Sequence, residues 1–326
     1  MKKSAFLLSL FFLAVPLLAA GETLDIGNSL NLNLAPENPK ANERVNASLE
    51  SYATNLDRSE IVWLLNGKEE VRGTGKTKFS FTTGALGSET TLSVSVKTLD
   101  GSFLNRVLHI RPALVSLVWQ AYSYTPPFYK GKALLPIEGT ASIIALPSFI
   151  TANGERIPPE QIIYTWREND RTVGDGSGYG KFSFPVKSKI PIRPITVSVE
   201  AVAPEAGLIA TAETTVSPVA PQILLYEERP LAGVSIRAAL SQSFSFAGDE
   251  MRITAMPYFF ETQRRASALT YAWSVNNTSS RETGPSITLR RTSTDNGRAQ
   301  LALSITSPKS IFQAAEALAT VLIGTQ

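Results

Sequence analysis

The sequence contains no cysteine, one histidine and three methionines among its 326 residues. Without cysteine the chain cannot form disulfides, carry a lipid on a cysteine side chain or use thiolate chemistry. The single histidine, His109, cannot belong to a metal site built from several histidine ligands. The folded part must therefore be held together by packing alone.

Long apolar runs are also missing, with one exception at the N-terminus. Lys2 and Lys3 precede an apolar stretch over 5–18, and small residues follow at 19–21. This order is typical of a secretory signal peptide, and the run is shorter than the ~20 residues that a spanning helix needs. We expect residues 1–21 to form a signal helix that directs export to the periplasm, cell surface or extracellular space. Cleavage is favoured; an uncleaved anchor is the alternative and would be the only part in contact with a membrane.

The sequence also lacks a large excess of basic over acidic residues, or of acidic over basic ones. The formal net charge of +3 includes Lys2 and Lys3, so the two signs are nearly balanced beyond residue 21. A nearly neutral chain lacks the electrostatic footprint of a nucleic-acid-binding protein. We therefore expect no nucleic-acid partner.

A pattern centred on tryptophan occurs three times. The copies are IVWLLNG at 61–67, YTWREND at 164–170 and YAWSVNN at 271–277. In each copy an apolar or aromatic residue lies two positions before the tryptophan, so both side chains point to the same face of a strand. An asparagine follows three residues after each tryptophan, and the residue after it is Gly, Asp or Asn, which is typical of a tight hairpin turn.

Alternating apolar and polar stretches surround each copy and indicate about seven short strands per unit, as in a β-sandwich. LESY (49–52), LPSF (146–149) and MPYF (256–259) end a strand before each tryptophan. QAAEALATVL (313–322) has helical propensity, but its counterparts alternate as strands do, so we expect a strand there.

Proline interrupts the strands at 111–113 and 217–221, which marks the domain boundaries. The sequence predicts an all-β chain of three tandem β-sandwich domains after the signal helix. The domains cover 22–112, 113–219 and 220–326, with Trp63, Trp166 and Trp273 as structural core residues.

A tryptophan on an inner strand, a turn after it, a glycine-rich hairpin and alternating strands together resemble bacterial immunoglobulin-like domains, in particular the PKD type. PKD domains usually carry WDFGDG after the strand, and this chain has fragments of it, such as Trp166 with Asp170 and VGDGSG at 173–178. Two further stretches are similar to stretches of secreted bacterial proteins without an assigned activity. They are YTPPFYKG (124–131) and PQILLYE (221–227). The resemblance implies tandem immunoglobulin-like domains and a role in the cell envelope.

The stretch YSYTPPFYKGKAL at 122–134 is rich in aromatic residues and has two interpretations. Exposed aromatics bind sugars in many β-sandwich modules, which would make a carbohydrate-binding surface. The other interpretation, which we favour, is architectural: half of the side chains alternate into the core while the prolines prevent unwanted edge pairing. The candidate ligand surface consists of Trp119, Tyr122, Tyr124, Phe128 and Tyr129.

The third repeat has a counterpart of this stretch in YEERPLAGVSIRAAL at 226–240. Both segments follow an entering strand and break at a proline, Pro127 or Pro230. Leu231 and Ala232 stand where Phe128 and Tyr129 do. The kinked strand is therefore shared, and only the extra aromatics are specific to the second repeat.

No motif indicates catalysis or a cofactor. GTGKT at 73–77 lacks the earlier glycine of a phosphate-binding loop, and LPIEG at 135–139 has Glu138 where a wall-sorting signal needs threonine. The acidic turns at 168–171, 174–178, 248–250 and 293–297 offer at most two carboxylates each, too few for calcium on their own. Paired carboxylates for glycoside hydrolysis can be distant in sequence, but nothing indicates such a pair.

We expect no catalytic residue, no metal and no cofactor. The sequence favours a non-enzymatic exported protein that serves as a structural spacer, an adhesion protein or an envelope-assembly component. Its expected partners are other envelope or surface proteins, or glycans. The alternative function is a carbohydrate-binding module that uses the aromatics of residues 119–129.

Overall fold

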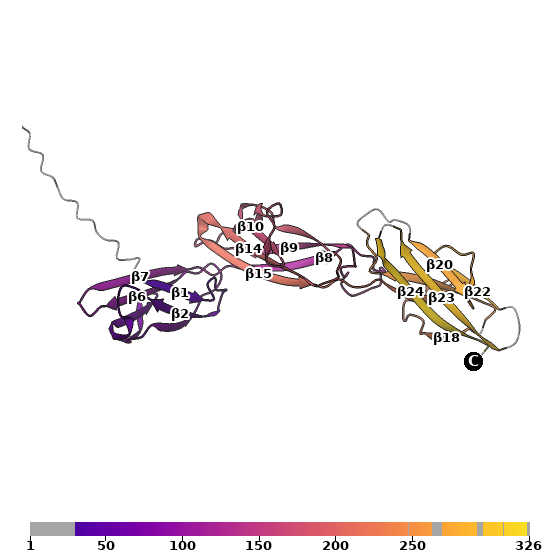
Figure 1. Ribbon diagram of the computed structural model, residues 1–326, viewed down its shortest axis with the longest axis horizontal. Coiled ribbons are helices and arrows are strands. Elements are labelled where there is room, and N and C mark those ends of the chain that lie inside the picture. The colour runs from indigo at the N-terminus through magenta and orange to yellow at the C-terminus, as the bar shows by residue number, and fades with distance from the viewer. Residues whose placement is uncertain (1–29, 247, 263–268, 292–295, 309, 325–326) are drawn as a thin grey trace, which may run out of the picture. The chain divides into compact units, whose positions relative to one another are not determined.

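The computed structural model describes residues 30–324 except 247, 263–268, 292–295 and 309. The expected signal helix at 1–21 lies outside these residues. In the described part, every regular element is a β-strand or a one-turn 3₁₀ helix. No helix there is long and apolar enough to cross a membrane. The strands form six sheets, which pair face to face as three β-sandwiches (Figure 1).

The first sandwich consists of a three-stranded and a four-stranded sheet. One sheet has the order β1-β2-β5 and the other β4-β3-β6-β7, and the 3₁₀ helix η2 precedes β3. The bounds are β1 Asn31–Ala35, β2 Arg44–Glu50, η2 Leu56–Arg58, β3 Glu60–Leu65, β4 Lys68–Thr74, β5 Lys78–Thr82, β6 Thr90–Lys97 and β7 Phe103–Ile110.

The second sandwich repeats this plan. Its sheets have the orders β13-β9-β8 and β11-β10-β14-β15, with β12 paired to β10. The bounds are β8 Leu114–Ala121, β9 Thr140–Ser148, η3 Pro159–Gln161, β10 Ile163–Glu168, β11 Arg171–Thr172, β12 Gly178–Tyr179, β13 Ser183–Lys187, β14 Ile195–Ala203, η4 Pro204–Ala206 and β15 Leu208–Val216.

The third sandwich has the sheet orders β17-β16-β19-β22 and β18-β24-β23-β20-β21 (Figure 1). Here β18 runs parallel to β24, so the segment after β16 crosses from one sheet to the other. The bounds are β16 Gln222–Arg229, β17 Gly233–Val234, β18 Ser243–Phe246, β19 Glu250–Tyr258, β20 Thr270–Val275, β21 Thr278–Ser279, β22 Ser286–Arg290, β23 Gly297–Ser307 and β24 Ser310–Ile323.

These strand orders are those of the immunoglobulin fold, in which strands A, B and E face strands C, F and G. The prediction of an all-β chain of tandem immunoglobulin-like sandwiches is therefore confirmed. QAAEALATVL lies within β24, as the alternation predicted. In β6 the alternation is regular: Leu92, Val94 and Val96 are buried and the residues between them are half-exposed.

The three repeated tryptophans lie on β3, β10 and β20, and all are buried. Each indole nitrogen donates a hydrogen bond to a backbone carbonyl of the following hairpin segment, so the polar atom of a large buried ring is satisfied. The pairs are Trp63 Nε1 to Lys76 O at 2.7 Å, Trp166 Nε1 to Lys181 O at 2.7 Å and Trp273 Nε1 to Gly284 O at 2.9 Å.

The repeated asparagines are also explained by the structure. Asn66, Asn169 and Asn276 have φ values of 51°, 48° and 49°, a left-handed conformation that asparagine tolerates better than most residues. Each exchanges two hydrogen bonds with one residue of β6, β14 or β23. In the second sandwich, Asn169 N donates to Thr196 O at 2.8 Å, and Thr196 N donates to Asn169 Oδ1 at 3.0 Å. Asn66 with Thr91 and Asn276 with Gln300 repeat this pair.

The chain divides into two compact units. The first comprises Asn46–Phe81, Thr91–His109 and the described part of Met1–Ala35. The second comprises Pro36–Val45, Thr82–Thr90 and the described part of Ile110–Gln326. The second and third sandwiches therefore belong to the same unit.

Candidate functional site

The aromatic stretch of the second sandwich lies in the segment that connects β8 to β9, residues 122–139. We call it the junction segment, because it contacts the third sandwich through backbone, aromatic and polar side-chain groups. Proline at 126, 127 and 136 keeps it out of regular strand pairing within its own sandwich. Its partners in the third sandwich are a tyrosine of β16, the last residue of β19 with the residues that follow it, and the first residues of β24.

Backbone hydrogen bonds join the junction segment to the end of β19. Tyr124 N donates to Phe260 O at 2.8 Å, and Phe259 N donates to Tyr124 O at 2.8 Å. Thr262 N donates to Tyr122 O at 2.9 Å. The two chain segments thus form a short antiparallel ladder, with Ser123 opposite Glu261. A main-chain ladder of this kind satisfies groups on both segments without requiring particular side chains.

An aromatic cluster lies beside this ladder. Phe128 meets Tyr226 edge to face with ring centroids 5.4 Å apart, and Tyr129 meets Tyr258 at 5.5 Å and Phe259 at 6.0 Å. Tyr226, Tyr258 and Phe259 are buried. The hydroxyl oxygens of Tyr226 and Tyr258 are 3.0 Å apart and share a hydrogen bond. Burial, and then this hydrogen bond, raise the pKa of Tyr258 well above its ordinary value.

Polar side chains complete the contact on the other side of the segment. Gln313 of β24 is 1% exposed, and its Nε2 donates to Ile137 O at 2.9 Å. Its Oε1 accepts a hydrogen bond from Glu261 N at 2.9 Å. Glu261 Oε2 in turn accepts one from Thr140 N at 2.7 Å, and Glu138 Oε2 accepts one from Phe312 N at 3.2 Å.

Glycine is required at the end of the junction segment. A Cβ on Gly139 would lie 2.2 Å from Pro136 Cγ and 2.7 Å from Glu261 Oε2, both too close for a real contact. The segment also pairs with the link into the third sandwich, since Ile137 N donates to Val219 O and Val219 N to Leu135 O. The short LPIEG motif therefore belongs to the junction.

The remaining aromatics of the candidate ligand surface have different environments. Trp119 on β8 packs partly against the core of the second sandwich, and Lys132 Nζ lies 3.2 Å from its ring centroid, in a cation–π contact. Burial lowers the pKa of Lys132. Tyr124 donates its hydroxyl to Met256 Sδ at 3.8 Å, and burial raises its pKa. Tyr122 is 36% exposed.

The sequence analysis therefore identified the residues that the second sandwich contributes to this contact, and it missed those of the third sandwich. The junction segment was singled out by its aromatics and prolines. Glu261, Gln313 and Phe312, which complete the contact, follow no motif, because they come from strands far away along the chain. The sequence offered one pattern close to Glu261, which is the correspondence of MPYF (256–259) in the third repeat with LPSF (146–149) in the second.

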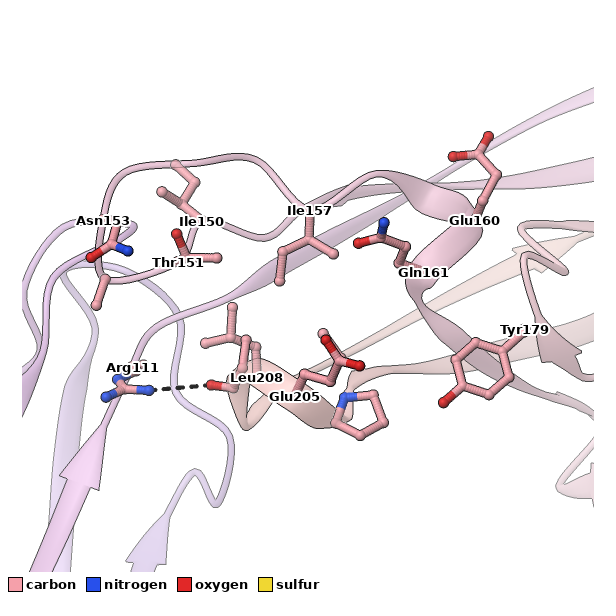
Figure 2. Close-up of a pocket in the computed structure, with 14 residues that line it drawn as sticks. Arg111, Ile150, Thr151, Asn153, Ile157, Glu160, Gln161, Tyr179, Glu205 and Leu208 are labelled. Atoms are coloured by element: carbon pink, nitrogen blue, oxygen red, sulfur yellow. Dashed lines mark hydrogen bonds between the residues drawn. The ribbon is translucent and has the colours of Figure 1, made fainter.

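A pocket of about 700 Å³ lies at the other end of the second sandwich, lined by the loop after β9, η3, β12 and η4. Figure 2 shows Arg111 and Tyr179 on opposite sides of it. The guanidinium of Arg111 is occupied, with Nη2 2.6 Å from Glu89 Oε2 and Nη1 donating to Ala206 O at 3.3 Å. The lining includes two carboxylates, Glu160 and Glu205, but no histidine. The pocket thus has no assembled set of nucleophile and base.

The acidic and histidine side chains that the sequence analysis weighed lie apart from one another in the described part of the chain. No three acidic or histidine side chains there are close enough together to hold a metal ion. His109 lies on β7, with Nδ1 3.5 Å from Thr91 Oγ1. Asp170 has a φ of 64° in the hairpin after β10, so its place is explained by the turn. The acidic turn at 293–297 lies largely outside the described residues.

No protein-family model matches the chain, and no curated protein matches it in sequence. Among solved structures, the three N-terminal domains of the Highly Immunogenic Outer Capsid protein of bacteriophage RB49 match at 9% identity and a TM-score of 0.27, covering 91% of this chain and 98% of theirs. The central fibronectin-III array of RIM-binding protein matches at 15% and 0.31, covering 91% and 96%. SGBP-B of the Bacteroides ovatus mixed-linkage glucan utilization locus, solved in complex with a mixed-linkage heptasaccharide, matches at 12% identity and a TM-score of 0.23, covering 87% of this chain and 63% of that chain. Similarities at these TM-scores carry no inference about this chain.

Proposed function

We propose that this chain is a non-enzymatic, exported protein in which PKD-like β-sandwiches serve as a structural spacer in adhesion or envelope assembly. The observation that supports the proposal is the use of the junction segment. Its backbone, aromatic rings and polar groups are engaged with the third sandwich, so the most distinctive stretch of the chain holds two sandwiches together.

A fixed junction suits a spacer for a physical reason. Sandwiches joined only by a loose linker sample many orientations, and each orientation must be given up when the protein binds or assembles. The ladder at Tyr124 and the ring contacts at Tyr129 remove that freedom in advance. The export expected from residues 1–21 would place such a spacer outside the cytoplasm.

The carbohydrate-binding alternative has less support. A sugar-binding platform needs an exposed aromatic face, and the rings of Phe128 and Tyr129 are packed against Tyr226, Tyr258 and Phe259. One face of Trp119 is covered by Lys132. We therefore propose a junction role for these aromatics in place of a ligand-binding role.

The test is complementation of a deletion strain of the source organism. The chain should be recovered from the exported fraction with an N-terminus near residue 22. Deletion should impair surface attachment or the assembly of an envelope structure, and the unaltered chain should restore it. Wild-type attachment and assembly in the deletion strain would contradict the proposal, and so would a chain that stays in the cytoplasm.

A matched pair of variants separates the junction from export. The double substitution Phe128→Ala with Tyr129→Ala removes the ring contacts of the junction, and Tyr122→Ala removes a half-exposed aromatic beside it. We expect the double variant to be exported but to complement poorly, while Tyr122→Ala complements fully. Binding of the unaltered chain to a glycan array, lost in Tyr124→Ala, would support the carbohydrate alternative instead.

A further inference from the structure

The pocket in the second sandwich, at the end away from the junction segment, has the dimensions of a binding site. Its volume of about 700 Å³ lies in the range of pockets that hold small organic ligands. Leu208 and Ala203 line it and are only 1% and 3% exposed, so its base is apolar. Polar side chains from the loop after β9, from η3 and from η4 surround this base (Figure 2).

Backbone hydrogen bonds within these walls give the pocket a fixed shape. In the loop after β9, Thr151 N donates to Glu155 O at 2.9 Å, which closes the turn that presents Asn153. In η4, Gly207 N donates to Pro204 O at 3.2 Å. A pocket that is already formed gives up little conformational freedom when a ligand enters it.

Tyr179 places an exposed aromatic ring on the wall of the pocket. The residue lies on the short strand β12, opposite Ile163 of β10, and the next amide, Gly180 N, donates to Ile162 O at 3.0 Å. The backbone is thus held, while the side chain is 65% exposed. The ring of Tyr129, by contrast, is packed against other aromatic rings. Tyr179 therefore offers the free aromatic face that the junction segment lacks, and such a face packs against the C–H groups of a sugar ring.

The polar side chains of the lining are not engaged with other groups. Within the described residues, the amides of Asn153 and Gln161 form no hydrogen bond, and the carboxylates of Glu160 and Glu205 form no ion pair. An amide both donates and accepts hydrogen bonds, whereas a carboxylate accepts them. Hydroxyl groups both donate and accept, so this set of side chains matches a ligand rich in hydroxyl groups.

The charges of the lining favour a neutral ligand. Arg111 is engaged with Glu89, which leaves the negative charges of Glu160 and Glu205 to repel an anion. Figure 2 shows these two carboxylates on different sides of the pocket, so they do not converge on one cation. Sites that enclose a cation surround it with several aromatic rings, and among the described residues of this lining Tyr179 is the single aromatic.

We propose that this pocket binds a neutral oligosaccharide. One sugar ring packs against Tyr179, and hydroxyl groups of the sugar hydrogen-bond to Asn153 and Gln161. The site is separate from the aromatics of residues 119–129. It adds a ligand to the spacer, and it does not depend on the spacer role.

An array of neutral, amino-sugar and acidic oligosaccharides tests the proposal with the purified full-length chain. We expect the chain to bind at least one neutral oligosaccharide. Tyr179→Ala and Gln161→Ala should each weaken this binding by about tenfold or more, because few contacts contribute most of the free energy of binding. Tyr179→Phe keeps the ring and should keep most of the binding. Tyr122→Ala is the matched control, since it removes an exposed tyrosine outside the pocket, and should bind as the unaltered chain does.

Hydrogen–deuterium exchange with the bound oligosaccharide locates the site. Peptides that cover 150–161 and 203–208 should become protected, and peptides that cover 122–139 should not. Because the Tyr179 side chain is 65% exposed, Tyr179→Ala should unfold at the temperature of the unaltered chain, which separates lost binding from lost folding.

Four results would overturn the proposal. They are an array without a neutral ligand, a preference for acidic sugars, binding that survives both Tyr179→Ala and Gln161→Ala, and binding that is lost in Tyr124→Ala but kept in Tyr179→Ala. The last result would place the sugar at the junction segment.

Discussion

At the scale of single residues, one tryptophan and one asparagine define each sandwich. The tryptophan fills the core and ties the following hairpin to it through its indole nitrogen. Three positions later the asparagine turns the chain and fixes the hairpin to the neighbouring strand. Both residues recur because each combines a conformational role with a hydrogen bond that few other side chains can make.

Truncation of the buried tryptophan should therefore destabilise the sandwich that contains it. We expect Trp166→Ala to lower the free energy of unfolding of the second sandwich by about 3–5 kcal/mol, because it leaves a large cavity. Trp119→Ala is the control, since that ring is only partly buried. Chemical denaturation followed by circular dichroism measures both. Near-native stability of the Trp166→Ala protein would contradict the assigned core position.

The asparagine makes two separable contributions. Asn169→Ala should cost about 1–3 kcal/mol, because it loses the acceptor of the Thr196 amide and places a Cβ without a compensating hydrogen bond in the left-handed region. Asn169→Gly keeps the left-handed conformation at no steric cost and loses only the acceptor, so its loss should be smaller. Thermal unfolding of the two variants compares them. Equal losses would show that the backbone conformation contributes nothing.

At the scale of elements, polar contacts hold β16 to β19 and β22 in the third sandwich. Glu228 of β16 accepts hydrogen bonds from the Thr254 hydroxyl and from Arg252 Nε, the latter at 2.9 Å. Ser286 Oγ donates to the same carboxylate oxygen at 3.4 Å. These hydrogen bonds, with Thr254 the largest contributor, hold the pKa of Glu228 below its ordinary value of 4.5.

This shift predicts an acid-sensitive third sandwich. A carboxyl group with a lowered pKa in the folded state stabilises it above the unfolded pKa, and the contribution disappears as the pH falls through the folded value. Glu228→Gln should therefore be less stable than the unaltered chain at pH 7, and the difference should shrink at acid pH. Hydrogen–deuterium exchange of peptides from β16, β19 and β22 in increasing urea, with all tryptophans left in place, would report it. A difference that stays constant with pH would refute the assignment.

The elements could be anticipated from the sequence far better than the junction. Strands can be predicted from the local alternation of apolar and polar residues, and the tryptophan repeat allows the three sets of strands to be aligned with one another. This alignment predicted a strand at 313–322 in spite of its helix-like composition. The junction depends on Gln313 and Glu261 meeting Ile137 and Thr140, and no local pattern encodes a meeting of segments so far apart along the chain. Aromatic content identified the right segment, but aromatics serve sugar binding and packing equally well.

At the scale of the whole molecule, the junction joins the second and third sandwiches into one cooperative part. The ladder at Tyr124, the ring contacts of Phe128 and Tyr129, and the hydrogen bond from Gln313 Nε2 to Ile137 O are lost together if the two sandwiches separate. Separation would expose Tyr258 and leave polar groups without protein partners. We therefore expect the unfolding of either sandwich to be linked to that of the other.

Removal of the ring contacts should break this linkage. We expect Phe128→Ala with Tyr129→Ala to split the calorimetric transition of the second and third sandwiches into two and to increase proteolysis near 217–221. Tyr122→Ala, which leaves the aromatic cluster intact, should behave as the unaltered chain. A single unchanged transition in the double variant would mean that the ladder alone couples the two sandwiches.

The parallel pairing of β18 with β24 also dictates an order of events during synthesis. Phe244 and Phe246 are buried beside a strand that is made last in the sandwich, so their pocket cannot close while the chain is still emerging. The loop that must close is nearly the whole sandwich, which makes this a late and slow step. If the chain crosses a membrane as it is made, the third sandwich can complete its core only after its last strand has come through.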